Sequence, residues 1–455
     1  MHELLFCAGI IALNFLVYYR TVKFGLISDD ATEMKFNPFN IKRSKIISIV
    51  LHTTIALYIY FAFGRTTASL VTALLFSIHP VAVQVPCWWT GRLYGLNALI
   101  FLLTVSFAPF SFPLYCIPFF PLGVATTLFT PLVFIFTKYW YFTFTFPIIV
   151  WLSYSHIRTG IKNKIENTGD IFRPVLQKDF SLHKFKWINL ILVVKTFGFY
   201  SLACLLPIKN GFYNSFLATL GSSKKATDYW YSFNRHFWGG LFAIVLMATV
   251  WWLNRLNFIG MGIMLFVCSI IPFLNFITVQ QMTTPRYAYL ALIGFQMALV
   301  GLVSQLPLPA QTGILGALFL FYLDRLFRVI KHYEKDNITM IELDSQVFPD
   351  NPRVWYFRYE HMLYKNNPIM AWAEATYGLK HLPEDCQLWF GLSVASFELG
   401  DMNAASEFLK TSERFMILCE RQNMQSIIEQ MKEKISVELR NKWKGPPTKS
   451  RGGFG

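Results

Sequence analysis

Long apolar runs alternate with short polar loops from the start of the chain to about position 330. Windows near the length of a spanning helix, roughly 20 residues, lie near 2–19, 46–63, 66–82, 93–109, 111–137, 139–155, 187–206, 237–253, 257–277, 287–304 and 311–329. The window 111–137 holds four prolines, so it is either one broken helix or a short pair. The pattern predicts an α-helical polytopic membrane protein with about 11 transmembrane helices.

A different pattern begins near residue 331, where charged residues are interspersed with periodic apolar ones. "FPDNPRVW" ends at Trp355 and "LPEDCQLW" ends at Trp389, 34 positions later, and two prolines and two alanines keep the same spacing. This period, with an aromatic residue in the first helix and a small residue where two helices touch, is typical of tetratricopeptide (TPR) repeats.

Three segments follow from these patterns. Residues 1–330 are expected to form the transmembrane domain and residues 331–441 a C-terminal α-helical TPR-like domain. A helix from about 421 to 441 would cap the repeats, and 442–455 is expected to be a disordered basic tail.

Composition supports a membrane protein, because 54% of residues are hydrophobic, 17% are aromatic and only 15% are charged. The net charge of +15 suits contact with membrane lipids or lipid phosphates, and no feature points to nucleic acid. The seven cysteines include no CxxC spacing, so we expect neither a disulfide framework nor a metal site. The first apolar run lacks the features of a removable signal peptide.

Loop charges predict the orientation. Loop 156–186 holds seven Lys or Arg against three acids and is expected to be cytoplasmic. Eleven spans then place the tail, together with loops 20–45, 83–92, 207–236 and 278–286, on the external face. Loop 20–45 opposes this assignment, with six basic residues against three acids. The membrane is either a bacterial inner membrane with a periplasmic C-terminus or an endoplasmic reticulum membrane with a lumenal one.

The external segments collect the polar residues that are costly near a membrane. The candidates are Asp29 and Asp30 in the first loop, His79, Gln84, Trp88, Trp89 and Arg92 in the second segment, Lys224, Lys225, Asp228, Arg235 and His236 in the third, and Gln281, Arg286 and Tyr287 in the fourth. These residues suggest sugar transfer from a lipid phosphate. One carboxylate would deprotonate the acceptor hydroxyl, and cations would neutralise the departing phosphate. Phosphate leaves without a general acid, which agrees with the few acids and several cations among the candidates. Neither a cofactor nor a divalent metal is implied.

Several candidates also have a structural interpretation. Asp29 and Asp30 could cap a short helix or lie in a solvated loop. His79 precedes Pro80 and could simply end a helix, and Trp88 and Trp89 could belong to an interfacial aromatic belt. Arg92 and Arg286 could be snorkelling anchors. Lys195 lies within a predicted span, near its end.

The chain resembles the transmembrane and tetratricopeptide-repeat protein O-mannosyltransferases, which have the C-type (GT-C) glycosyltransferase fold. The matching segments follow in order: "SDDATEMKFNP", "HPVAVQVPCWWTGR", "KTFGFYSLACLLP", "PRYAYLALIGF" and then the repeats. Where relatives carry acids, this chain has Gln84 and Tyr94.

The resemblance implies a polyprenyl-phosphate or dolichyl-phosphate sugar as co-substrate, with a mannose-like sugar transferred to a protein or glycan acceptor held by the repeats. By position, Asp29 or Asp30 would lie at the reaction centre. The donor phosphate would be bound by Arg286, with Arg92, Lys224 and Lys225 as further candidates. Two other functions stay open: a non-catalytic scaffold that binds a partner through its repeats, and a ligase or polymerase of lipid-linked glycans.

Overall fold

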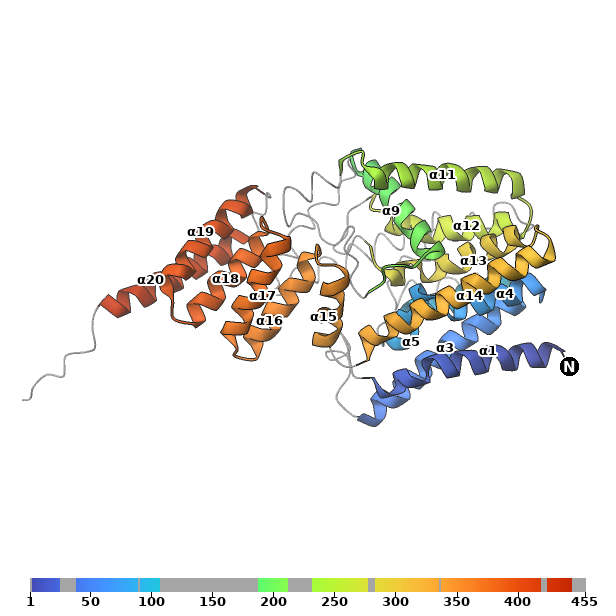
Figure 1. Cartoon of the computed structure of the whole chain (residues 1–455), viewed down its shortest axis with the longest axis horizontal. Helices are drawn as coiled ribbons and strands as arrows, with labels where there is room; N and C mark the ends of the chain where they lie inside the picture. The colour runs from blue at the N-terminus through green and yellow to red at the C-terminus, as the bar shows by residue number, and fades with distance from the viewer. Residues whose placement is uncertain are drawn as a thin grey trace, which may run out of the picture. The chain divides into compact units, whose positions relative to one another are not determined.

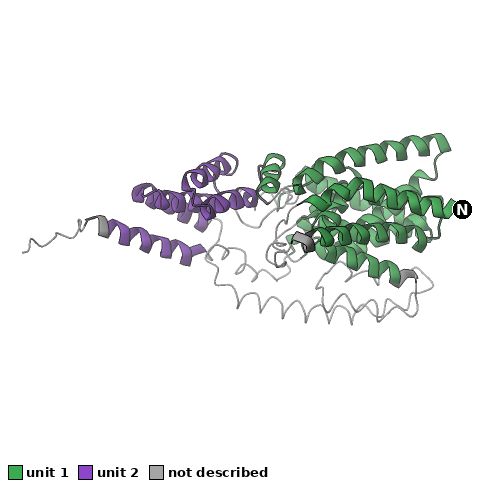
Figure 2. Cartoon of the chain, turned by 90° about the horizontal axis from the view of Figure 1, so that it is seen from below, with its two compact units in different colours: residues 1–166, 182–218, 230–348 green, residues 167–181, 219–229, 349–455 purple. Residues whose placement is uncertain are grey.

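The computed structural model describes residues 2–24, 38–88, 91–106, 187–211, 231–276, 283–334, 337–418 and 424–443. Within these ranges the fold is all-helical, with 16 α-helices and no strand (Figure 1). Unit 1 comprises residues 1–166, 182–218 and 230–348, and unit 2 comprises 167–181, 219–229 and 349–455 (Figure 2). The predicted helical class is therefore confirmed, and the division between the units follows Phe348, whereas the sequence suggested residue 330.

Unit 1 is built around one central helix. Its α-helices are α1 (His2–Tyr18), α3 (Pro38–Ala62), α4 (Thr67–Ser77), α5 (Gln84–Cys87), α6 (Arg92–Ser106), α9 (Asn189–Leu205), α11 (Arg235–Asn254), α12 (Phe258–Ile270), α13 (Tyr289–Val303), α14 (Leu308–Ile330) and α15 (Asn337–Val347). Short 3-10 turns join several of them: η1 (Tyr19–Lys23), η2 (Pro80–Val83), η9 (Ile271–Phe273), η10 (Pro285–Ala288) and η11 (Lys331–Tyr333). Helix α13 is apolar on all sides and packs against α4, α6, α9, α12 and α14, as is typical of a largely buried helix.

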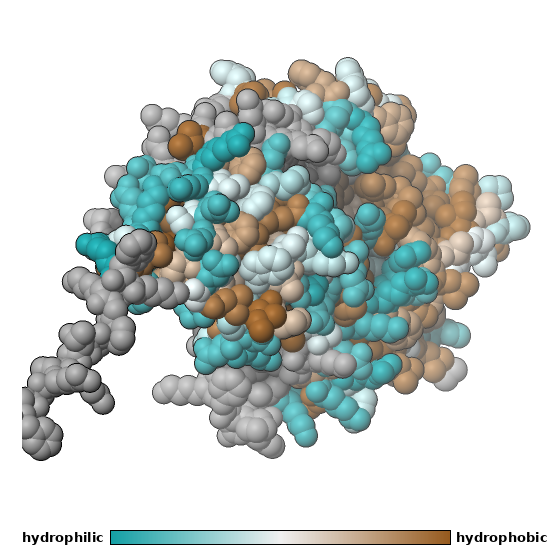
Figure 3. Space-filling view, turned by 60° about the vertical axis from the view of Figure 1, so that its left-hand side comes forward, coloured by the Kyte–Doolittle hydropathy of each residue, from teal (hydrophilic) through white to brown (hydrophobic). Residues whose placement is uncertain are grey.

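Four helical segments of the described chain are long and apolar enough to cross a membrane: His2–Lys23, Lys42–Ala62, Arg235–Asn254 and Pro285–Val303. Thr67–Ser77 and Pro80–Cys87, which meet at a 58° bend, would make a fifth if they form one span. Hydrophobic side chains are also frequent on the surface of unit 1, in the right-hand part of Figure 3. These features are compatible with a membrane protein. The count of eleven spans stays a prediction, and the windows 111–137 and 139–155 lie outside the described residues.

Helix α11 has the surface of a lipid-facing span. Phe242, Val245 and Leu253 are exposed along its length, and the Arg255 guanidinium lies 5.0 Å from the Trp252 ring centroid just beyond its end. Its 20 residues make a helix about 30 Å long, which matches the hydrocarbon core of a bilayer. Arginine and tryptophan at the ends of such a helix are typical interfacial anchors.

The inner side of α11 approaches α9 through glycine. A methyl group added at Gly240 would collide with the backbone oxygen of Val194, and one added at Gly198 would lie 2.5 Å from the Cα of Gly240. At the neighbouring Gly239 such a methyl group would meet no atom within 4 Å. Close backbone approach at small residues is a common means of helix association in membranes.

Gly240→Ala is therefore expected to lower the stability of the full chain by about 1–3 kcal/mol through overpacking. Gly239→Ala is the matched control, because it adds the same methyl group on the open side and improves helix propensity. Thermal unfolding in detergent measures both. Equal transition temperatures for the two variants would contradict the glycine contact.

Buried polar groups hold the break between α4 and η2. The carbonyl oxygen of Ser77, at the end of α4, accepts a hydrogen bond from the Tyr18 hydroxyl at 3.0 Å and contacts Nε2 of His52 at 3.2 Å. The other ring nitrogen of His52 lies 2.7 Å from the Tyr289 hydroxyl. Helix ends leave carbonyls without intrahelical partners, so these contacts from α1 and α3 let a helix stop inside the apolar core.

Unit 2 consists of α16 (Pro352–Tyr364), α17 (Pro368–His381), α18 (Cys386–Glu398), α19 (Met402–Leu418) and α20 (Gln425–Trp443). Helix α18 begins 34 residues after α16, and α19 begins 34 residues after α17. The same spacing separates Trp355 from Trp389. The indole N–H of Trp355 donates to the carbonyl of Pro349 at 2.8 Å, and Trp389 donates to Pro383 at the same distance. The sequence repeat is thus also a repeat of structure.

The turns between the paired helices repeat as well. Asn366 and Gly400 occupy equivalent positions in the two pairs, and both have positive φ angles, of 53° and 79°. The next residues, Asn367 and Asp401, cap α17 and α19 by accepting backbone N–H groups at 3.2 and 3.0 Å. Both turns use residue types that tolerate a left-handed backbone.

Gly400→Ala is expected to destabilise the α18–α19 pair by about 1 kcal/mol, because alanine is strained at this φ angle while a methyl group there meets no atom within 4 Å. Asn366→Gly, the matching change in the first turn, should be neutral or slightly stabilising. Hydrogen exchange of the α18 and α19 amides measures the effect, and unchanged protection in Gly400→Ala would contradict it.

Candidate functional site

Arg286 is the centre of a cationic and aromatic cluster in unit 1. It lies in η10 and is only 8% exposed. Its guanidinium carbon lies 5.1 Å from the Trp88 ring centroid and 5.3 Å from that of Tyr287, and the Tyr94 hydroxyl lies near the guanidinium. We call Arg286, Trp88, Tyr94 and Tyr287 the Arg286 cluster. Aromatic faces stabilise a cation that has been removed from water.

Local packing fixes the chain on both sides of Arg286. The Tyr200 hydroxyl accepts a hydrogen bond from the backbone N–H of Thr284 at 3.2 Å, two residues before the arginine. The Tyr287 ring stacks on Phe273 with centroids 4.2 Å apart and an interplanar angle of 14°. Tyr200 comes from α9 and Phe273 from η9, so two other elements hold η10 in place.

Trp88 is positioned by a buried lysine. Lys45 of α3 is 1% exposed, and its ammonium group donates a hydrogen bond to the carbonyl of Cys87, the residue before Trp88. The carbonyls at the end of α5 need partners from outside that helix. Lys45 therefore anchors the end of the broken α4–α5 segment next to the Arg286 cluster.

Tyr333 adds a further phenol near the cluster. It is fully buried in η11, and burial raises the pKa of its hydroxyl well above the usual value, with the charge of Asp344 adding to the rise. The Gln84 side chain and the Arg286 guanidinium lie near enough to oppose this pKa shift in part. Tyr333 thus stays a neutral hydroxyl at physiological pH.

His79 makes contacts within the helical core. Its Nδ1 accepts the backbone N–H of Val81 at 3.2 Å, which requires the other nitrogen to carry the proton, and Nε2 donates to the carbonyl of Cys204 at 3.0 Å. Tyr322 donates to the adjacent carbonyl of Leu205 at 3.1 Å. His79 therefore begins η2 and, together with Tyr322, satisfies carbonyls at the end of α9, which agrees with the helix-terminating interpretation.

Arg92, Arg235 and His236 lie at the starts of two other helices, α6 and α11. Arg92 is the first residue of α6, two residues before Tyr94, and is partly exposed. Arg235 and His236 begin α11, where Asn234 caps the helix by accepting the N–H of His236 at 3.1 Å. The charges of Arg235 and Lys195 both act on the His236 imidazole, so these three groups form a separate basic region.

The remaining predicted site residues lie outside the described residues. They are Asp29, Asp30, Trp89, Lys224, Lys225, Asp228 and Gln281. Of the predicted residues that are described, the structure brings Trp88, Arg286 and Tyr287 together, and Gln84 accepts the backbone N–H of Trp88 through its carbonyl at 3.0 Å. Within the described ranges, no three His, Cys, Asp or Glu side chains group closely enough to hold a metal ion.

Three residues of this region do not stand out in the sequence: Lys45, Tyr200 and Tyr333. The proximity of Tyr94 to Arg286 is not apparent in the sequence either. Lys45 falls in a predicted loop because the apolar window begins one residue later. Tyr200 follows Lys195 in "KTFGFY" by five positions, so it lies more than one helical turn away along α9. Buried polar residues at the ends of apolar windows are the signal that could have found them.

The arrangement suits an anion with an apolar or sugar portion. A guanidinium fork binds phosphate or carboxylate oxygens in pairs, and the surrounding rings offer surfaces for a sugar or an isoprenoid chain. Comparisons of the chain with protein-family models, with curated proteins and with solved structures find no match.

Proposed function

We propose that the protein is a membrane glycosyltransferase of the GT-C type that transfers a mannose-like sugar from a polyprenyl-phosphate donor to a protein or glycan on the external or lumenal face. The observation that carries this proposal is the meeting of three resembling segments around Arg286. "HPVAVQVPCWWTGR" supplies Trp88, "KTFGFYSLACLLP" supplies Tyr200 and "PRYAYLALIGF" supplies Arg286 itself. Segments that share one function are expected to share one site.

In the proposed reaction the acceptor hydroxyl attacks the anomeric carbon while the bond from that carbon to the phosphate oxygen breaks. The hydroxyl proton passes to the carboxylate of Asp29 or Asp30 as general base. Arg286 neutralises the charge that develops on the leaving polyprenyl phosphate. A single displacement of this kind inverts the anomeric configuration.

The same proposal includes eleven membrane spans with the tail on the external face. It also identifies the repeats as TPR repeats. The repeat identity is supported by the matching spacing of the helix starts and by the equivalent Trp355 and Trp389 hydrogen bonds. In this scheme the repeats hold the acceptor near the site.

A transfer assay with a panel of donors tests the proposal. Purified protein in lipid vesicles is given radiolabelled sugars on polyprenyl monophosphate and, separately, glycans on polyprenyl pyrophosphate. Transfer from the monophosphate donors is expected. Transfer only from the pyrophosphate-linked glycan would indicate a ligase, and no transfer from any donor, with partner binding by the repeats intact, would indicate a scaffold.

A further inference from the structure

The first helix pair of unit 2 carries a broad stripe of exposed apolar side chains. On α17, Ile369, Met370, Trp372 and Tyr377 are 67%, 42%, 38% and 54% exposed, and Tyr364 at the end of α16 is 88% exposed. At about 100° per residue the four α17 side chains fall within roughly 160° of the helix circumference. We call these five residues the α17 face. Single exposed apolar residues are common on a soluble surface, whereas a contiguous set marks an interaction site.

The charges beside the α17 face are positive. Between residues 364 and 381 the exposed charged side chains are Lys365 and Lys380, and the Lys380 ammonium lies 4.7 Å from the Tyr377 ring centroid. The one acid in this stretch, Glu374, is buried and pairs with Arg358 at 2.7 Å. The face therefore combines aromatic and aliphatic side chains with a local excess of positive charge.

The second helix pair provides an internal comparison. At the equivalent positions of that pair, the five apolar residues are replaced by Glu398, Asn403, Ala404, Ser406 and Thr411. The stretch 398–415 also holds four acids against two basic residues. Because α19 forms the same kind of helix pair with a polar outer surface, the repeat itself does not require the apolar α17 face.

We propose that the α17 face docks on the headgroup region of an anionic membrane. Aromatic and aliphatic side chains interleaved with lysine are the composition of interfacial membrane contacts, and anionic lipids attract each lysine. The chain joins this face to apolar helices by a short connection, because α14 ends at Ile330 and this part of unit 2 begins at Pro349. Positive charge without an exposed acid disfavours a second copy of the same face as the occupant.

Photocrosslinking in the full chain tests this docking. The photoreactive residue p-benzoylphenylalanine is placed at position 369 or, as the matched control, at the exposed position 403 of the second pair. The two proteins are reconstituted in nanodiscs of phosphatidylcholine with phosphatidylserine, irradiated and analysed by mass spectrometry. Lipid adducts are expected at position 369 and not at position 403. Both positions are exposed, so neither change disturbs the helix packing.

The charge dependence supplies the second measurement. Lys365→Gln and Lys380→Gln should each lower the adduct yield at position 369 by about fivefold. Omission of phosphatidylserine removes the attraction of both lysines and should lower the yield further. Equal lipid adducts at positions 369 and 403 would overturn the proposal. So would adducts at position 369 to a second copy of the chain or to another protein in place of lipid.

Discussion

Replacement of Arg286 by glutamine is expected to lower kcat/KM for sugar transfer from a polyprenyl-phosphate donor by about 100- to 1,000-fold, the usual cost of losing a group that stabilises developing charge. Arg286→Lys keeps the charge but loses the planar fork, so its activity should lie between those of glutamine and wild type. The reason is the position of the guanidinium, whose carbon lies 5.1 Å from the Trp88 ring centroid and which lies near the Tyr94 hydroxyl in a buried cluster.

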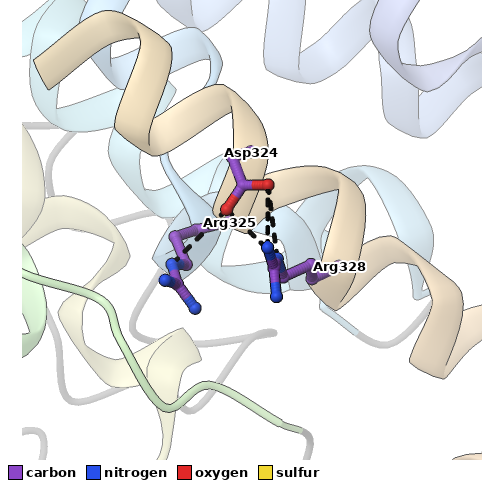
Figure 4. A network of polar contacts seen from close by, with 3 residues as sticks. All are labelled: Asp324, Arg325 and Arg328. Atoms are coloured by element: carbon purple, nitrogen blue, oxygen red, sulfur yellow. Dashed lines mark hydrogen bonds and ion pairs between the residues drawn. The ribbon is translucent and has the colours of Figure 1, made fainter. Parts of the chain in front are cut away.

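Arg328→Gln is the matched control for this substitution. Arg328 is exposed and pairs with Asp324 at 3.1 Å on one turn of α14, with Arg325 on the other side of the same carboxylate (Figure 4). Exposed pairs of this kind contribute about 0.3–0.5 kcal/mol, so activity should not change. Thermal unfolding of all variants separates loss of folding from loss of catalysis. Wild-type kcat/KM in a folded Arg286→Gln protein would show that the cluster does not bind the donor.

One of the two substitutions Asp29→Asn and Asp30→Asn is expected to lower kcat by about 100- to 10,000-fold, because asparagine cannot accept the acceptor proton. The donor KM should change little, since the phosphate is bound by other groups. Single-turnover transfer with saturating donor measures the effect on the chemical step.

Asparagine also separates this role from the capping interpretation. Asparagine caps a helix about as well as aspartate does, so a purely structural Asp29 or Asp30 would leave both activity and stability unchanged in the asparagine variants. Alanine at the same positions is the companion control, because it removes a cap and a base together. Full activity in the double asparagine variant would exclude both residues as the general base.

The helical class and the positions of most helices follow from the sequence, because long apolar windows and the 34-residue period report directly on burial. The windows 187–206 and 237–253, for example, coincide closely with α9 and α11. The bend after Ser77 cannot be predicted from the sequence, because that bend depends on hydrogen bonds from Tyr18 and His52 in other helices. Partners distant in sequence leave no trace in a local pattern.

The candidate site shows the same limit. Trp88 and Arg286 are predictable because large aromatic and cationic residues stand out in loops between apolar windows, and the structure places them in contact. In the sequence Tyr94 is noticeable only as the replacement of an acid. Lys45 is one of six basic residues in its predicted loop, although its ammonium reaches the carbonyl of Cys87. Such roles depend on where a helix end meets its neighbours.

The 34-residue repeat does not predict the α17 face. The 34-residue period identifies what the two helix pairs share, but the difference between Ile369 and Asn403 becomes meaningful only because both positions are exposed. A repeat constrains the residues that pack between its helices and leaves the outer surface free to differ.

The most direct test of the proposed reaction counts the polyprenyl phosphate that purified wild-type protein releases from a polyprenyl-phosphate sugar in the presence of acceptor. We expect one polyprenyl phosphate for each sugar transferred, with inverted anomeric configuration in the product. Release should fall to background in the Arg286→Gln protein. Absence of release by the folded wild type, or equal release by wild type and Arg286→Gln, would contradict a glycosyltransferase centred on Arg286.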